Sequence, residues 1–299
     1  MNSSQNNMLY TYSSARGDFA KDPAVAEFAG KWFLYHSIFD EDNKLGIAIA
    51  TSDDGENFSY QCKIPLELEC EQNGIGAPGA IVYNGRLHLF YQTYGNGRLD
   101  AICHAVSDDG ISFKRVSSEP VFALREPYAT MPDWSCGRAI DADVCIHGGK
   151  LILYFATRDI AFKRQIVGAA TADLTPELDG RFELYPDIVL EPILDWERDC
   201  IEAPATVEID GKVYMFYGGS YNCAPQQIGC AVSDDGLHFE RLCVEKPYLE
   251  CGKPGDWNSS ESGHPYIYKA NDGRLWLYYQ GSPDNGKHWY ITRTEAVIN

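Results

Sequence analysis

One short hairpin plan recurs five times along the chain, and this repeat limits the possible folds more than any other feature of the sequence. Each copy has a small or acidic head, a short apolar strand, a turn with glycine and an alternating aromatic strand. The heads are Asp22, Ala77, Asp141, Glu202 and the pair Gly263-His264. The turn glycines are Gly30, Gly85, Gly149, Gly211 and Gly273. They recur about every 55 to 64 residues, which is within reach of propeller blades that carry long loops.

A second hairpin follows the first in most of the copies. The segments IAIATSDDGENF, CHAVSDDGISF and GCAVSDDGLHF each join two strand-like runs by an Asp-Gly turn, and the third copy has the longer GAATADLTPELDGRF. SDDG is similar to the Asp box of sialidases, but its glycine follows the aspartate at once, so we interpret it as turn chemistry. No amphipathic helix of three turns is present. The prediction is an all-β, five-bladed propeller with about four antiparallel strands per blade, forming one domain over residues 1–299.

Charge and composition exclude several classes of partner. The formal net charge is -18 and the basic residues are scattered singly, which argues against nucleic acid and anionic membranes as partners. The first residues have no basic, apolar signal pattern and no run of apolar residues is long enough to span a membrane, so a cytoplasmic protein is expected. None of the ten cysteines has CxxC spacing, and free thiols are predicted rather than a zinc site.

The acidic heads are the candidate functional residues. The innermost strands of a propeller begin near its axis, so Asp22, Asp141 and Glu202 are expected to meet in one funnel although they lie far apart in sequence. Carboxylates crowded into one pocket repel one another and raise one another's pKa. A purely structural role does not explain why the chain would keep this unfavourable arrangement. Cleavage of a glycosidic bond needs one carboxylic acid as proton donor and one carboxylate as base or nucleophile, and a third acid can hold the donor at a raised pKa.

The blade heads carry a family resemblance from about residue 16 to residue 290. The quoted motifs are Asp22-Pro23 before WFLYHS, Ala77-Pro78 before LHLFYQT, Ile140-Asp141 before LILYFAT, Glu202-Ala203-Pro204 before VYMFYGGS, and Gly263-His264 before DGRLWLYYQ. Together they resemble the blade motifs of family 43 glycoside hydrolases. The resemblance implies a five-bladed propeller that hydrolyses arabinofuranosides or xylosides with inversion, here at the ends of short oligosaccharides.

Matched position by position, the resemblance also implies roles. Asp22 would be the general base, Glu202 the general acid, and Asp141 the residue that tunes and orients Glu202. His264 would lie by the axis, near water or a calcium ion; no cofactor is required. Glu-Ala-Pro replaces the Glu-Gly-Pro of many members, which is a small change. Two alternatives stay open: a retaining fructosidase-like furanosidase or glycoside phosphorylase, and a carbohydrate-binding propeller without catalysis.

Other residues near the heads are candidates for substrate contact. Arg138 lies three positions before Asp141 and is expected either to reach the pocket or to form a surface ion pair. Asp143 is the alternative to Asp141 on the same strand. We favour Asp141, because the other repeats have a small residue or a neighbour of proline at the position of Asp143. Three tryptophans precede the third, fourth and fifth heads, where they would stack on a sugar or pack between blades: Trp134, Trp196 and Trp257. The segment before the third blade offers further residues for the pocket wall: Arg125, Glu126 and Asp133.

Overall fold

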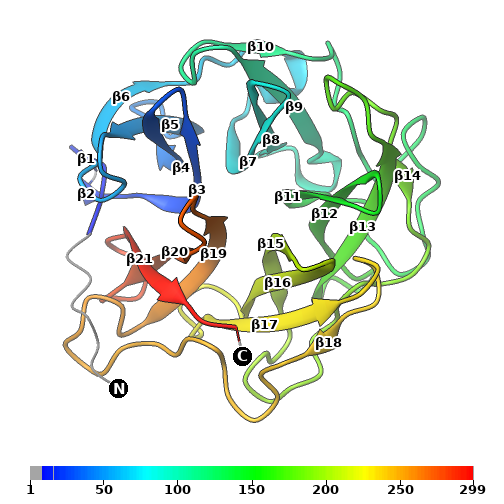
Figure 1. Cartoon of the computed structure of the whole chain (residues 1–299). Coiled ribbons are helices and arrows are strands. Elements are labelled where there is room, and N and C mark those ends of the chain that lie inside the picture. Colours follow the sequence, from blue (N-terminus) through cyan, green and yellow to red (C-terminus); the bar gives the residue numbers. More distant parts are fainter. Residues whose placement is uncertain (1–8, 16, 299) are drawn as a thin grey trace.

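Five antiparallel sheets stand around one central axis in the computed structural model, which describes residues 9–15 and 17–298 (Figure 1). In each sheet the strands follow chain order, and the first strand lies innermost. Within the described ranges the only helical segments are two single 3₁₀ turns, η1 (Glu69–Glu71) and η2 (Gly97–Leu99). The predicted all-β, five-bladed propeller is confirmed.

The blades follow one another in sequence order around the ring. The first blade comprises β3 (Lys21–Phe28), β4 (Lys31–Phe39), β5 (Leu45–Ser52) and β6 (Ser59–Lys63). The second comprises β7 (Ile75–Tyr83), β8 (Arg86–Thr93), β9 (Ile102–Ser107) and β10 (Phe113–Arg115). The third comprises β11 (Ile140–His147), β12 (Lys150–Arg158), β13 (Gln165–Asp173) and β14 (Glu183–Leu184). The fourth comprises β15 (Ile201–Ile209), β16 (Lys212–Gly219), β17 (Gln227–Ser233) and β18 (Glu240–Arg241). The fifth comprises β19 (Glu261–Lys269), β20 (Leu275–Ser282) and β21 (Tyr290–Ala296).

The N-terminal segment completes the fifth blade. A short hairpin of β1 (Ser13–Ser14) and β2 (Gly17–Asp18) precedes the first blade. Just before it, Tyr10 pairs with Ile291 of β21 through two backbone hydrogen bonds of 2.8 Å. The segment at Tyr10 therefore lies on the outer edge of the last blade and closes the ring.

Apolar side chains fill the wedges between neighbouring blades. Strands of a propeller blade are covered on both faces by the next blades, so their apolar residues are continuous rather than strictly alternating. Leu34 of β4, Leu89 of β8, Leu153 of β12 and Phe216 of β16 are each fully buried in one of four such clusters. All ten cysteines are free thiols, as predicted.

The SDDG turns join neighbouring blades as well as closing their own hairpins. In the second blade the Ser107 hydroxyl accepts from the backbone N–H of Gly110 at 2.8 Å, and Asp109 accepts from the two N–H groups that follow the glycine. The buried carbonyl of Gly110 accepts a hydrogen bond from the hydroxyl of Tyr35 in the first blade, at 2.9 Å. The turn interpretation of SDDG is confirmed.

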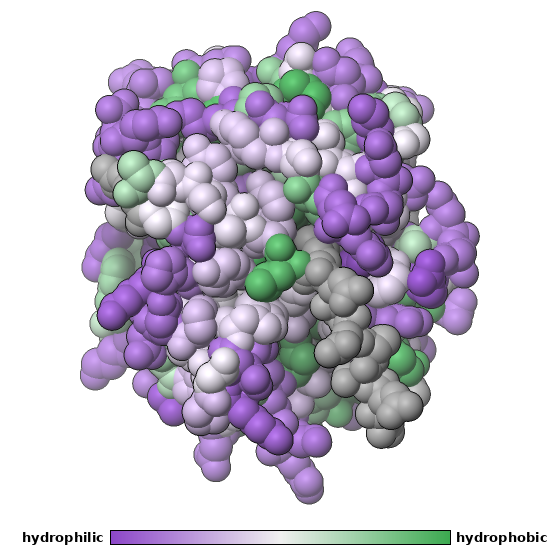
Figure 2. Space-filling model, turned by 90° about the vertical axis from the view of Figure 1, so that its left-hand side faces the viewer, coloured by the Kyte–Doolittle hydropathy of each residue, from purple (hydrophilic) through white to green (hydrophobic). Residues whose placement is uncertain are grey.

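The side of the ring shown in Figure 2 is mostly hydrophilic, with charged and polar residues around scattered apolar ones. No helix within residues 9–15 and 17–298 is long and apolar enough to cross a membrane.

Candidate active site

Every innermost strand has a β-bulge at its head, and the bulges aim side chains at the axis. Register shifts in the pairing with the second strand occur at the same place in all five blades. At each shift one non-glycine residue has a positive φ, between 40° and 52°. These residues are Asp22, Ala77, Asp141, Ala203 and His264. A bulge bends its strand and re-aims its side chains, and bulges are often found next to active sites.

The bulges also reveal a difference from the sequence alignment. Glu202 comes one position before the bulge residue Ala203, whereas Asp22 and Asp141 are themselves bulge residues. Glu202 is therefore equivalent to Lys21 of the first blade and not to Asp22. The alignment missed this because it counted from the acid of each head, and only the backbone pairing shows where each bulge falls.

Side chains from the preceding blade fix the backbone of four of the five bulges. Gln280 of β20 accepts from the N–H of Asp22 at 2.9 Å, and Gln92 of β8 accepts from the N–H of Asp141 at 2.8 Å. Ser37 does the same for Ala77, and Gln226 for His264. Each head is thus held by its neighbour in the ring. Sequence analysis missed these positioning residues, although Gln92 and Gln280 both follow the aromatic end of a second strand.

His264 links two of the predicted carboxylates. Its Nδ1 lies 3.0 Å from Asp22 Oδ1 and its Nε2 lies 3.3 Å from Glu202 Oε1. Burial alone would lower the pKa of this histidine, but the charges of Asp22, Glu202 and Asp141 outweigh burial and raise its pKa to about 9. The imidazolium form is ion-paired with both acids, one at each ring nitrogen.

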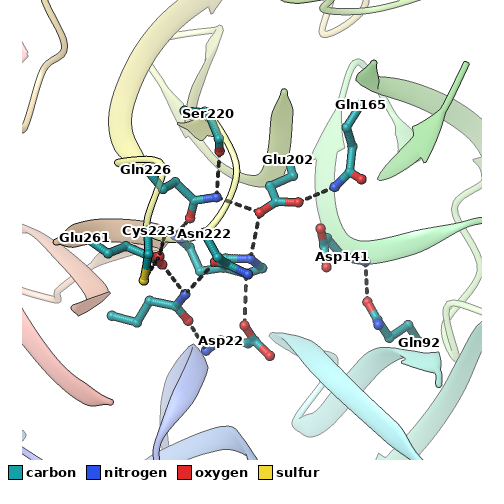
Figure 3. A network of polar contacts seen from close by, with 12 residues as sticks. Asp22, Gln92, Asp141, Gln165, Glu202, Ser220, Asn222, Cys223, Gln226 and Glu261 are labelled. Carbon is teal, nitrogen blue, oxygen red and sulfur yellow. Dashed lines mark hydrogen bonds and ion pairs between the residues drawn. The ribbon is translucent and has the colours of Figure 1, made fainter. Parts of the chain in front are cut away.

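Glu202 receives amide donors in addition to His264 (Figure 3). Gln226 donates to Oε1 at 2.5 Å, and Gln165 donates to Oε2. Burial favours the neutral acid, but the hydrogen bond from His264 and the amide of Gln226 outweigh it and lower the pKa of Glu202. The sequence prediction of a raised pKa at this residue is therefore wrong for the free protein, because the donors that surround Glu202 favour its charged form.

Asp141, in contrast to Glu202, has a raised pKa. Its burial, joined by the negative charges of Glu202 and Asp22 and opposed by His264, raises its pKa to about 6. Its Oδ2 is buried without a hydrogen-bond partner among the described residues. In Figure 3, Asp141 projects from the third blade into the space beside Glu202. A proton held by the cluster is therefore more stable on Asp141 than on Glu202.

The three acids line a pocket of about 320 Å³. Its wall includes His264 and the predicted Arg138. Aromatic residues that sequence analysis did not identify also line it: Phe19, Phe39, Tyr94, Tyr221 and Trp289. Lys21 completes one side, with its ammonium group 4.3 Å above the ring of Trp289.

The three predicted tryptophans are not part of this pocket wall. Trp134 packs toward Gly168, Trp196 covers Gly219 and Gly229, and Trp257 covers Gly281. Each ring occupies the space left by a glycine on a neighbouring strand, which agrees with the packing alternative. Trp134 also donates its ring N–H to the carbonyl of Pro186 at 2.7 Å.

The remaining candidates divide between the pocket and the scaffold. Arg138 lines the pocket and lies 3.3 Å from Asp100, whose side chain is almost fully buried. Asp143 turns to the fourth blade, where it accepts from the N–H and hydroxyl of Thr206 at 2.8 and 2.5 Å; its burial raises its pKa to about 7. The preference for Asp141 over Asp143 agrees with this geometry. Three others lie outside the pocket wall: Arg125, Glu126 and Asp133.

The residues around His264 do not suit the calcium ion considered from the sequence. Ligand atoms of Asp141, Glu202 and His264 lie within 4.8 Å of one another. Calcium takes six to eight oxygen ligands. His264 offers nitrogen, and both of its nitrogens face carboxylates, so this centre is better described as an ion-pair network.

Comparison with solved structures gives the same fold over nearly the whole chain. A thermostable family-43 glycoside hydrolase aligns at 23% identity with a TM-score of 0.74, covering 97% of this chain and 94% of that one. The chain has the fold of family 43 glycoside hydrolases. The α-L-arabinofuranosidase from Lactobacillus brevis aligns at 16% identity with a TM-score of 0.71, covering 94% of this chain and 91% of the enzyme.

An endo-arabinase from Bacteroides thetaiotaomicron VPI-5482 shares this family 43 fold at 18% identity, with a TM-score of 0.69, over 99% of this chain and 98% of the enzyme. No protein-family sequence model and no curated protein sequence matches the chain. The fold-level resemblance expected from the blade motifs is confirmed. At these identities the comparison supports the architecture, and the chemistry depends on the site itself.

Proposed function

We propose that the protein is a glycoside hydrolase that removes terminal sugars from short oligosaccharides by an inverting acid/base mechanism. The observation that carries the proposal is the meeting of Asp22, Asp141 and Glu202 from three blades around one pocket. Glycosidases use a pair of carboxyl groups on either side of the scissile bond. Furanosides such as α-L-arabinofuranosides, or β-xylosides, are the proposed substrates, in keeping with the arabinofuranosidase and endo-arabinase among the structural neighbours.

In the proposed mechanism Glu202 protonates the leaving oxygen and Asp22 removes a proton from the attacking water. An imidazole ring lies between these two carboxyl groups. This separation favours the wider inverting spacing of about 6.5–9.5 Å over the retaining spacing of about 5–5.5 Å, because the inverting pair leaves room for water. A pocket of about 320 Å³ is at the small end of the usual range of about 300–1,000 Å³, which suits a terminal sugar.

The proton donor must be protonated when the substrate is bound. In the free protein the pKa of Glu202 is lowered and that of Asp141 is raised to about 6. A sugar that fills the pocket displaces water and increases the desolvation of Glu202, which favours its neutral form. Asp141 lies beside Glu202 and, with its raised pKa, supplies the nearest proton. Once it has lost that proton, its negative charge opposes the ionisation of Glu202.

The experiment is a screen of nitrophenyl furanosides and pyranosides, followed by Glu202→Gln and Asp22→Asn on the best substrate. Each variant is expected to lower kcat by about 10²–10⁴-fold, the usual contribution of a general acid or base. Dinitrophenyl glycosides, whose leaving group needs little protonation, should recover much of the rate of Glu202→Gln but none of that of Asp22→Asn. NMR of the first-formed anomer reports inversion.

Glu208→Gln is the matched control. It makes the same substitution on the same strand, at an exposed position outside the pocket, and activity should not change. Full activity of Glu202→Gln or Asp22→Asn on nitrophenyl substrates would contradict the proposed roles. Binding of the glycosides without turnover would instead favour a carbohydrate-binding propeller.

A further inference from the structure

One side of the pocket mouth carries two arginines that form no ion pair with the carboxylates of the described residues. Arg158, at the end of β12, lines the pocket, and its guanidinium lies 5.8 Å from the ring centre of Phe162 and 5.2 Å from that of Tyr221. Arg98 of η2, in the second blade, lies 4.6 Å from the same Phe162 ring. Two guanidinium groups from different blades thus gather on one aromatic ring.

Neither group has an acidic partner. Within residues 9–15 and 17–298, no carboxylate oxygen lies within 4.0 Å of a nitrogen of Arg98 or Arg158. Most other arginines of the chain do have such a partner, for example Arg115 with Glu71 at 2.8 Å and Arg241 with Glu197 at 2.7 Å. In a protein with 43 acidic and 25 basic residues, a pair of arginines without a carboxylate is unexpected at a pocket mouth.

The position of Arg158 relates it to the leaving group. Gln165 accepts from Arg158 Nε at 3.4 Å and donates its amide to Glu202. The guanidinium of Arg158 is therefore only one side chain away from the proposed proton donor, which must stand beside the leaving oxygen. The other pocket cations are already engaged: Arg138 with Asp100, and Lys21 among the charges of Asp22, Glu261 and Glu202.

We propose that the pocket takes an acidic saccharide, in which the sugar on the leaving-group side carries a carboxylate that binds Arg158, with Arg98 at the rim. This inference rests on the proposed glycosidase function and specifies its substrate class. A guanidinium binds a carboxylate through two parallel hydrogen bonds, and the rings of Phe162 and Tyr221 lie close enough to limit the positions that Arg158 can take. A neutral sugar would leave both arginines without a counter-charge.

Binding tests the inference without any need for turnover. D-galacturonate and D-glucuronate are titrated calorimetrically against galactose and glucose, at low and high salt. The uronates should bind about tenfold more tightly than the neutral sugars at low salt, and the preference should shrink as salt rises. Arg158→Gln should abolish the preference, and Arg98→Gln, at an exposed position, should reduce it.

Arg164→Gln is the matched control because Arg164 lies nearby but pairs with Glu191 at 2.8 Å. It should keep the preference for uronates. Equal affinity for uronates and neutral sugars would overturn the inference, as would an unchanged preference in Arg158→Gln. Inorganic phosphate is titrated in parallel: phosphate that binds through Arg158 while the uronates do not would also overturn it, and would indicate a free anion instead of an acidic sugar.

Hydrolysis provides the second measurement. A disaccharide with a uronic acid on the leaving side is compared with its neutral counterpart, and the ratio of their kcat/KM values should fall about tenfold in Arg158→Gln. If no glycoside is cleaved but the uronates still bind through Arg158, the proposed function fails while the anion site stands. If neutral glycosides are cleaved and the uronates show no preference, the anion site fails alone.

Discussion

At the scale of single residues, the hydrogen-bond donors around Glu202 favour its charged form and lower its pKa. Sequence reasoning identified the acids because they recur at the heads of a repeat, where like charges need an explanation. It did not identify Gln165 and Gln226, because a single glutamine in a loop or strand carries no repeat signal and its role depends on which blade it faces. The same holds for the one-residue offset of Glu202, which follows from backbone pairing and leaves no trace in composition.

Gln165→Leu is predicted to move the alkaline limit of activity upward. The amide of Gln165 stabilises the charged form of Glu202, whose pKa is lowered in the free protein. Its loss destabilises the carboxylate, so the pKa rises and the neutral acid persists to higher pH. We expect the alkaline limb of the kcat/KM profile to shift by roughly one pH unit.

The control for this prediction is Gln227→Leu. Gln227 lies at the start of β17 and accepts from the backbone N–H of Cys251 at 3.3 Å, without contact to a carboxylate. Its profile should match that of the unmodified protein. A downward shift in Gln165→Leu would show that another group sets the alkaline limb.

The SDDG turn closes its own hairpin and also accepts a hydrogen bond from a tyrosine of a neighbouring blade. Only the first of these two roles was predicted from the sequence. An Asp-Gly turn between two short strands is a local sequence signal for a hairpin, so this part of the fold could be predicted. The bond to the next blade could not, because it depends on how two blades pack. The tyrosine bond from Tyr35 to Gly110 has counterparts from Tyr154 to Gly236 at 2.7 Å and from Tyr278 to Gly55 at 3.3 Å.

Gly110→Ala is predicted to destabilise the protein by about 2 kcal/mol, because it adds a steric conflict to an unfavourable backbone angle. Gly110 has a φ of 77°, and a Cβ placed there would lie 2.5 Å from the ring of Phe33 in the first blade. Gly30→Ala separates the two effects, since Gly30 has the same φ of 77° with nothing within 4 Å of its Cβ position. Urea unfolding should show a clearly larger loss for Gly110→Ala, and equal losses would rule out the contact between blades.

At the scale of the whole molecule, the five blades form a ring that must be closed. The repeat predicted how many blades there are, since five similar copies can bury their faces only against one another. It did not predict the closure, because Tyr10 lies before the first repeat. The chain meets itself at this residue: its backbone pairs with Ile291 of the last blade, and its phenol lies 3.1 Å from Nε2 of His36 in the first.

Tyr10→Ala tests whether this closure stabilises the ring. Tyr10 is buried, and its ring packs edge-on against His36 and Phe58 with centroid distances of 5.1 and 6.4 Å. Truncation of a buried aromatic side chain costs about 3–5 kcal/mol when the site cannot collapse. We expect a loss of about 3 kcal/mol in urea unfolding, at the low end of that range because a single bridge on the edge of a blade relaxes more easily than a central strand. Tyr12→Ala is the control, since its ring packs on the exposed Tyr60 and should cost less than about 1 kcal/mol. A small loss for Tyr10→Ala would mean that the contacts between β19 and β3 hold the first and last blades together without the N-terminal segment.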